Sequence, residues 1–171
     1  EAPSSAEEFG LESQEVNFKV ITSVVQLTGL YAGRTDAGRS AAVRKFNGSG
    51  KGQEAVLKAL RWLMAQQTPN GSWGGAGGSP AHTGLALLCF LAHGETPLSE
   101  EFGLCVQKGM QWLASTMVDK KNVGQRAYGH GIATYALAEA YSMTRIPFLR
   151  VAMEVGLDTI IKGQQAGGGF D

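Results

Sequence analysis

One short motif recurs about every 47 to 50 residues, and this recurrence limits the possible folds more than any other feature of the chain. The first copy runs from Lys58 to Trp62, continues to Gln66 and ends with Gly71-Ser-Trp73. The second copy keeps Lys108 to Trp112 and then diverges. The third copy retains the following residues: Gly156, Ile160, Gln164, Gly168 and Phe170. Repeats of this length are typical of helix pairs stacked side by side, so the sequence predicts a helical scaffold more clearly than a reaction.

The composition is that of one packed domain with no net charge to attract a charged partner. The chain has 171 residues, of which 43% are hydrophobic, and its 15 basic and 15 acidic residues cancel. A balanced charge gives no overall field that would attract nucleic acid, so we expect no nucleic-acid partner. The longest apolar run, residues 85–92, is far shorter than the roughly 18 residues of a spanning helix. We therefore expect no transmembrane segment in this part of the chain.

Residues 1–52 differ in character from the rest of the chain. Residues 1–13 are polar and acidic, which predicts a tether, and residues 16–24 alternate in polarity as in a strand or extended arm. Residues 28–52 are rich in glycine and basic side chains, which predicts a long loop with one short helix near residues 39–44. The start at Glu1, without methionine, suggests that a removed signal or anchor preceded it, which would place the protein outside the cytoplasm.

From Gln53 onward the hydrophobic pattern becomes helical. Amphipathic helices are expected at residues 53–67, 99–117 and 147–164. Between them, two nearly continuous apolar helices are expected at residues 80–93, where Ser79 is the N-cap, and at residues 131–143. This alternation predicts inner helices buried on every side and outer helices polar on one side, in a partial ring that ends within the third repeat. Cys89 and Cys105 lie in apolar patterns and are expected to be buried and unbridged.

The motif from Lys58 to Trp73 resembles the repeats of squalene-hopene cyclases, prenyltransferase beta subunits and related prenyltransferase/squalene-oxidase repeat proteins, including bacterial members of uncharacterised function. This resemblance covers residues 53–171 and implies an all-α fold, a partial alpha/alpha toroid of helical hairpins. It also implies a structural role for the motif residues. Gln66 would bond to freed backbone groups, Trp73 would stack back, and Gly71 would permit the tight turn. The corresponding bracing positions are Trp112, Gln164, Gly168 and Phe170.

The catalytic signatures of these families are missing from the chain. Its aspartates are isolated, so no Asp-x-Asp-Asp acid is present, and no cofactor is expected. His82 and Cys89 lie seven residues apart on one inner helix, but a zinc site needs three such ligands, so no metal site is predicted.

Four polar or aromatic residues are candidates for ligand binding. His82 and His130, 48 residues apart, would lie at equivalent helix starts on one rim, where they could bind an anionic group or simply cap their helices. Glu139 is the only charge on its helix between Gly131 and Ser142, and Tyr135 lies one turn away. Glu139 could act as an acid in an apolar setting, or it could pair with a basic side chain such as Arg145 or Arg150.

The sequence therefore favours a non-catalytic toroid module, an interaction scaffold that binds an apolar ligand or peptide on its concave face. The expected partners are a further protein, additional repeats of the same chain, or an apolar small molecule. The alternative is a fragment of a terpenoid cyclase or prenyltransferase-like enzyme that acts on an isoprenoid and carries its acid elsewhere.

Overall fold

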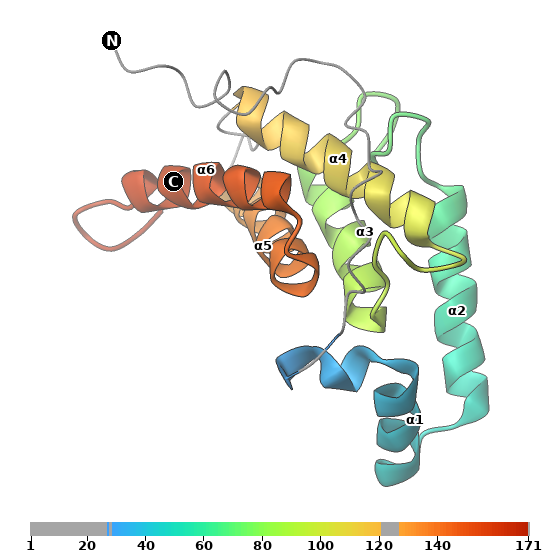
Figure 1. The fold of residues 1–171 in the computed structure, drawn as a ribbon. Coiled ribbons are helices and arrows are strands. Elements are labelled where there is room, and N and C mark those ends of the chain that lie inside the picture. Colours follow the sequence, from blue (N-terminus) through green and yellow to red (C-terminus); the bar gives the residue numbers. More distant parts are fainter. Residues whose placement is uncertain (1–26, 28, 121–126, 171) are drawn as a thin grey trace.

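The computed structural model describes residue 27 and residues 29–120 and 127–170. Within these residues the chain forms helices and no strands. One 3-10 helix precedes six α-helices, and consecutive helices of the array pack antiparallel (Figure 1). The elements are η2 (Gly29–Arg34), α1 (Asp36–Lys45), α2 (Gly50–Ala65), α3 (Pro80–His93), α4 (Gly103–Lys120), α5 (Ala127–Thr144) and α6 (Pro147–Gly163). The all-α prediction is confirmed for these residues.

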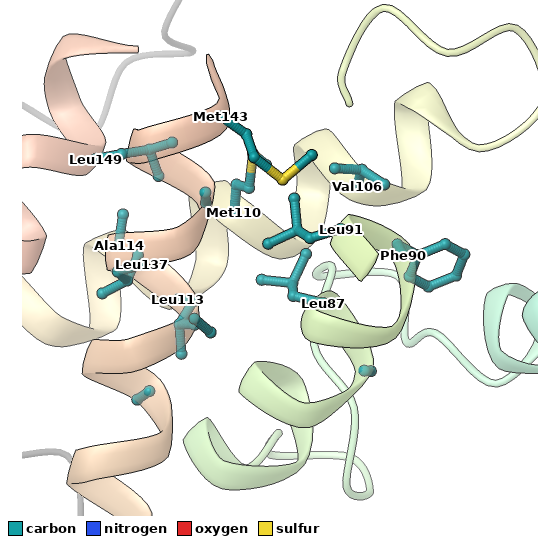
Figure 2. Packing of buried hydrophobic residues seen from close by; sticks show 14 of the residues in the cluster. Leu87, Phe90, Leu91, Val106, Met110, Leu113, Ala114, Leu137, Met143 and Leu149 are labelled. Carbon is teal, nitrogen blue, oxygen red and sulfur yellow. The ribbon is translucent and has the colours of Figure 1, made fainter. Parts of the chain in front are cut away.

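Helices α3 to α6 form two layers around a shared core. α3 packs against α5, α4 packs against α6, and α5 also packs closely on α6. The side chains between the layers are fully buried and meet in one cluster, which includes Leu87 and Leu91 of α3, Met110 of α4, Leu137 of α5 and Leu149 of α6 (Figure 2). The helices predicted to be inner (α3, α5) therefore form one layer, and those predicted to be outer (α4, α6) form the other, and these names are kept below.

Glycines in the outer helices show that the repeat is real in three dimensions. A Cβ atom added at Gly109 of α4 would lie 2.9 Å from the Leu87 side chain of α3. One added at Gly156 of α6 would lie 2.5 Å from the Thr134 hydroxyl of α5. Gly109 and Gly156 are 47 residues apart, and so are Leu87 and Thr134. Each outer helix thus approaches its inner helix closely at the same repeat position.

The loop after α2 forms a tight corner around Trp73. Its indole is only 4% exposed and donates from Nε1 to the Leu63 carbonyl over 2.8 Å, while its backbone amide donates to the Thr83 hydroxyl over 3.0 Å. The corner turns at Gly71, whose φ of 92° suits glycine and whose added Cβ would lie 2.5 Å from the Lys108 carbonyl. The expected bracing roles of Trp73 and Gly71 agree with this geometry.

The glutamine that braces this corner is Gln67 and not Gln66. The Gln67 side-chain amide donates to the Gly71 carbonyl over 3.0 Å and to the Cys105 carbonyl of α4 over 2.9 Å. Gln66 is exposed and ends α2. The hydrogen bonds to backbone carbonyls that were expected of Gln66 are therefore made by the next residue, Gln67.

The third copy of the motif forms the same corner near the end of the described residues. Gln164 donates to the Gly168 carbonyl over 3.2 Å, just as Gln67 does to Gly71, and Gly168 has a φ of 86°. A single antiparallel bridge joins Gln164 to Phe170. Unlike Trp73, the Phe170 ring is 51% exposed. The second copy offers Trp112, which is half-buried beside Gly78 in the loop after the first corner.

The expected loop over residues 28–52 is instead mostly helical from Gly29 onward. α1 follows an N-cap at Thr35, and α2 begins three residues earlier than predicted because Ser49 accepts a hydrogen bond from the Gly52 amide. The predicted tether and strand-like arm, residues 1–13 and 16–24, lie outside the described residues.

Two further expectations differ from the structure. α4 begins at Gly103 because the Ser99 hydroxyl accepts from the Thr96 amide and so stabilises the preceding turn. The inner helix α3 is not buried on every side, since Leu85 and Cys89 are exposed on one face. That face has no neighbouring inner helix among the described residues, whereas Gly84, about 100° further around α3, lies against Ile132 and Ala133 of α5.

Candidate functional site

The inner helices present apolar side chains to solvent. Tyr128 and Tyr135 of α5 are 73% and 58% exposed, and Leu85 of α3 is also exposed. The two helices lie side by side and run in the same direction, because a Cβ at Gly84 of α3 would contact Ile132 of α5 near the start of both helices, and Arg34 contacts both Leu91 and Met143 near their ends. Large exposed aromatic side chains on a packed scaffold are typical of binding surfaces.

Tyr128, Tyr135 and Glu139 lie along one side of α5. Seven and four residues separate them, which corresponds to about two turns and one turn of a helix. The side chain of Glu139 is mostly buried, whereas both tyrosine rings project into solvent. Of the predicted ligand-binding residues, Tyr135 and Glu139 therefore lie one turn apart on α5.

Glu139 forms an ion pair with Arg34 of η2 and not with Arg145 or Arg150. Arg34 also donates from Nη1 to the Leu91 carbonyl of α3 over 3.2 Å and contacts Met143 Sδ at 3.1 Å. One guanidinium thus joins η2 to the C-terminal portions of both inner helices. The prediction that Glu139 pairs with a basic side chain is confirmed, but the partner comes from the segment that was expected to be a loop.

The two histidines occupy different environments. His82 is exposed at the start of α3, where its amide donates to the Ser79 hydroxyl. His130 is 4% exposed, and its Nε2 lies 2.9 Å from the Gly156 carbonyl of α6. The repeat equivalent of His130 is Thr83, 47 residues earlier, which likewise bonds a backbone group through its side chain. Both histidines therefore lie near the starts of their inner helices, but only the His82 side chain is exposed, and His130 joins α5 to α6.

The two cysteines are unbridged, as predicted, but only one is buried. Cys105 of α4 is buried in the hydrophobic core, where burial raises the pKa of its thiol to about 11, although Lys108 opposes the shift. Cys89 is exposed on α3. The apolar sequence around Cys89 does not predict this exposure, because Cys89 would be buried only if another helix packed against that face of α3.

A cleft lies between α1, α2 and the loop after α3. This open cleft of about 840 Å³ is bordered by Arg39, Arg44 and Glu100. Arg39 donates to the carbonyls of Arg34 and His93 and pairs with Asp36, so it holds α1 against the C-terminal end of α3. The Arg39 side chain is thus committed to structure within this cleft.

Over residues 29–120 and 127–170, no group of three or more His, Cys, Asp or Glu side chains is placed to hold a metal ion. None of the helices in this described part has the length and apolar character needed to cross a membrane. No protein-family model matches the chain, and no curated protein or solved structure shows significant similarity to it.

Proposed function

We propose that the chain is a repeat module of an alpha/alpha toroid and that it serves as a non-catalytic scaffold, binding an apolar ligand or peptide on the concave face of its inner helices. The observation that carries this proposal is the exposure of Tyr128 and Tyr135 on α5. Burying two such rings against a ligand would remove on the order of 150–250 Å² of surface each.

The toroid part of the proposal is supported by the recurrence of both contacts and corners. Inner and outer helices alternate, and two corners share one hydrogen-bond pattern at Gln67 and Gln164. Successive repeats of this kind curve into extended concave surfaces. The inner helices would then line the concave side.

The non-catalytic part is supported by the commitments of the polar side chains. The carboxylate of Glu139 is held by Arg34, which is itself anchored to the Leu91 carbonyl. Together these groups form a cross-link between elements, which is a structural role. The tyrosines beside them offer contact area and hydroxyl groups to a ligand.

The proposal is tested by titrating the protein with the fluorescent apolar probe 1-anilinonaphthalene-8-sulfonate. Y128S combined with Y135S should weaken binding of the probe at least about fivefold, because the exposed rings of Tyr128 and Tyr135 on α5 are removed. L104S is the matched control, since Leu104 is an exposed apolar side chain on the outer helix α4. Equal binding by both variants would contradict the proposal.

A second experiment addresses the natural ligand. Native mass spectrometry of the protein purified from its own cell extract should show a bound apolar molecule or peptide that Y128S with Y135S releases. Conversion of an added isoprenoid into product by the chain would instead support the enzymatic alternative.

A further inference from the structure

The contact between the first corner and α4 defines an interface that the chain could use again. Gln67 donates to the Cys105 carbonyl, and Gly71 lies against the Lys108 carbonyl. A Cβ at Gly109 would lie 3.0 Å from the Trp73 ring. One corner and one helical stripe of small residues are therefore the two halves of this interface.

The first half is present again, uncovered, at the third corner. Gln164, Gly168 and Phe170 reproduce the hydrogen bond, the positive φ and the ring of the first corner. Nothing lies within 4 Å of a Cβ added at Gly168, whereas Gly71 is closed off by α4. The third corner is thus formed without a helix seated on it in the described structure.

The second half is also present on α2, where the described residues leave it exposed. Ala55, Val56 and Ala59 of α2 precede Cys105, Val106 and Gly109 of α4 by 50 residues. Val106 is fully buried, but Val56 is 44% exposed, and both alanines are exposed. Trp62 shows the same contrast, being 62% exposed where its equivalent Trp112 is half-buried. α2 and α6 lie at opposite edges of the array (Figure 1).

We infer that a second copy of this chain docks the α2 stripe, Ala55, Val56 and Ala59, onto the third corner, Gln164 to Phe170. The Gln164 amide would donate to the Ala55 carbonyl, as Gln67 does to Cys105. The side-chain sizes compensate for one another, because Phe170 is smaller than its equivalent Trp73 and Ala59 is larger than its equivalent Gly109. The third corner should therefore accept α2, because the residues of α2 correspond one to one with the residues of α4 that cover the first corner.

Such an interface is heterologous, since different surfaces of the two copies meet. Head-to-tail contacts of this kind extend into closed rings or open filaments and do not stop at a symmetric dimer. The inference does not rest on the ligand proposed for the inner helices.

Sedimentation velocity over a range of concentrations tests the inference with V56D and F170D. Both side chains are exposed in the single chain, so both variants should fold, as far-UV circular dichroism would check. The unmodified chain should gain mass with concentration, and each variant alone should show a dissociation constant at least about tenfold higher, which corresponds to about 1.4 kcal/mol. An equimolar mixture should restore association but stop at a heterodimer, because one intact corner then meets one intact stripe.

The matched control is S115D, at an exposed position of α4 away from both surfaces, which should leave association unchanged. Disulfide formation gives an independent readout in a C89S background. K58C mixed with G168C should form a cross-linked pair, because a Cβ at Gly71, the equivalent of Gly168, would lie 2.9 Å from the Cβ of Lys108, the equivalent of Lys58. S115C mixed with G168C should not. A chain that stays monomeric, a mixture that does not associate, or association unaffected by V56D and F170D would overturn the inference.

Discussion

Replacing Trp73 with alanine tests whether the corner holds neighbouring helices together. The indole joins three elements: it bonds to the end of α2 at Leu63, lies 6.1 Å from the Phe90 ring of α3, and packs beside Gly109 of α4. Its side chain is almost fully enclosed. The change would therefore open a cavity where three helices meet.

The expected cost follows from these contacts. Removal of a buried tryptophan or phenylalanine side chain costs about 3–5 kcal/mol. The loss includes the Nε1 hydrogen bond, which contributes about 1 kcal/mol and leaves the Leu63 carbonyl without this donor. Domains of this size unfold with about 5–15 kcal/mol, so W73A should remain folded with a clearly reduced margin. W73F keeps a ring in place and should cost less.

Urea unfolding followed by circular dichroism measures this cost, and W62A is the matched control. Trp62 belongs to the same motif but is largely exposed, so W62A should change the free energy of unfolding by no more than about 0.5 kcal/mol. Equal destabilisation by W73A and W62A would refute the reasoning, because it would remove the distinction between a bracing and an exposed tryptophan.

Three further predictions concern single side chains. Q67A should cost about 1–3 kcal/mol in urea unfolding, because two hydrogen bonds are lost, while Q66A should be nearly neutral, and the reverse order would contradict the assignment. G71A should destabilise the protein by more than about 2 kcal/mol, because its Cβ would overlap the Lys108 carbonyl. G168A should cost only the roughly 1–2 kcal/mol that a positive φ costs a residue with a Cβ. Similar costs for the two variants would show that the first corner is not closed by α4. At pH 8 a thiol reagent should modify Cys89 quickly and Cys105 only after unfolding. Because the folded pKa of Cys105 is raised from 9.0 to about 11, its contribution to stability is complete below pH 9 and is lost as the pH rises toward 11, a loss that C105A should reduce.

The helices that carry apolar stripes were predictable from the sequence. Ser79 and Pro80 located the start of α3, and Pro147 located the start of α6. α1 was missed as a full helix because it has no buried residue and so no apolar stripe, being formed mainly of Ala, Gly, Ser and Arg. Its position depends on Arg39, which bonds to the end of α3, and no local pattern reveals such a distant contact.

The candidate site was predictable only in part, because helical positions change face with every residue. His82 and His130 are 48 residues apart, but the repeat spacing of the inner helices is 47. One residue rotates a side chain by about 100°, which separates the exposed His82 from the buried His130. Similarly, the apolar pattern of α3 could not show which of its sides lacks a neighbour, so the exposure of Leu85 was missed.

Hydrogen exchange measured by mass spectrometry at low and high protein concentration tests most directly whether one repeating corner builds this protein. At low concentration the amides of residues 67–73 should exchange slowly under α4, and those of residues 164–170 should exchange quickly despite the same hydrogen-bond pattern. At high concentration residues 164–170 and the α2 stripe should become protected together. Equal exchange at the two corners at low concentration, or protection of the third corner that does not respond to concentration, would contradict the account.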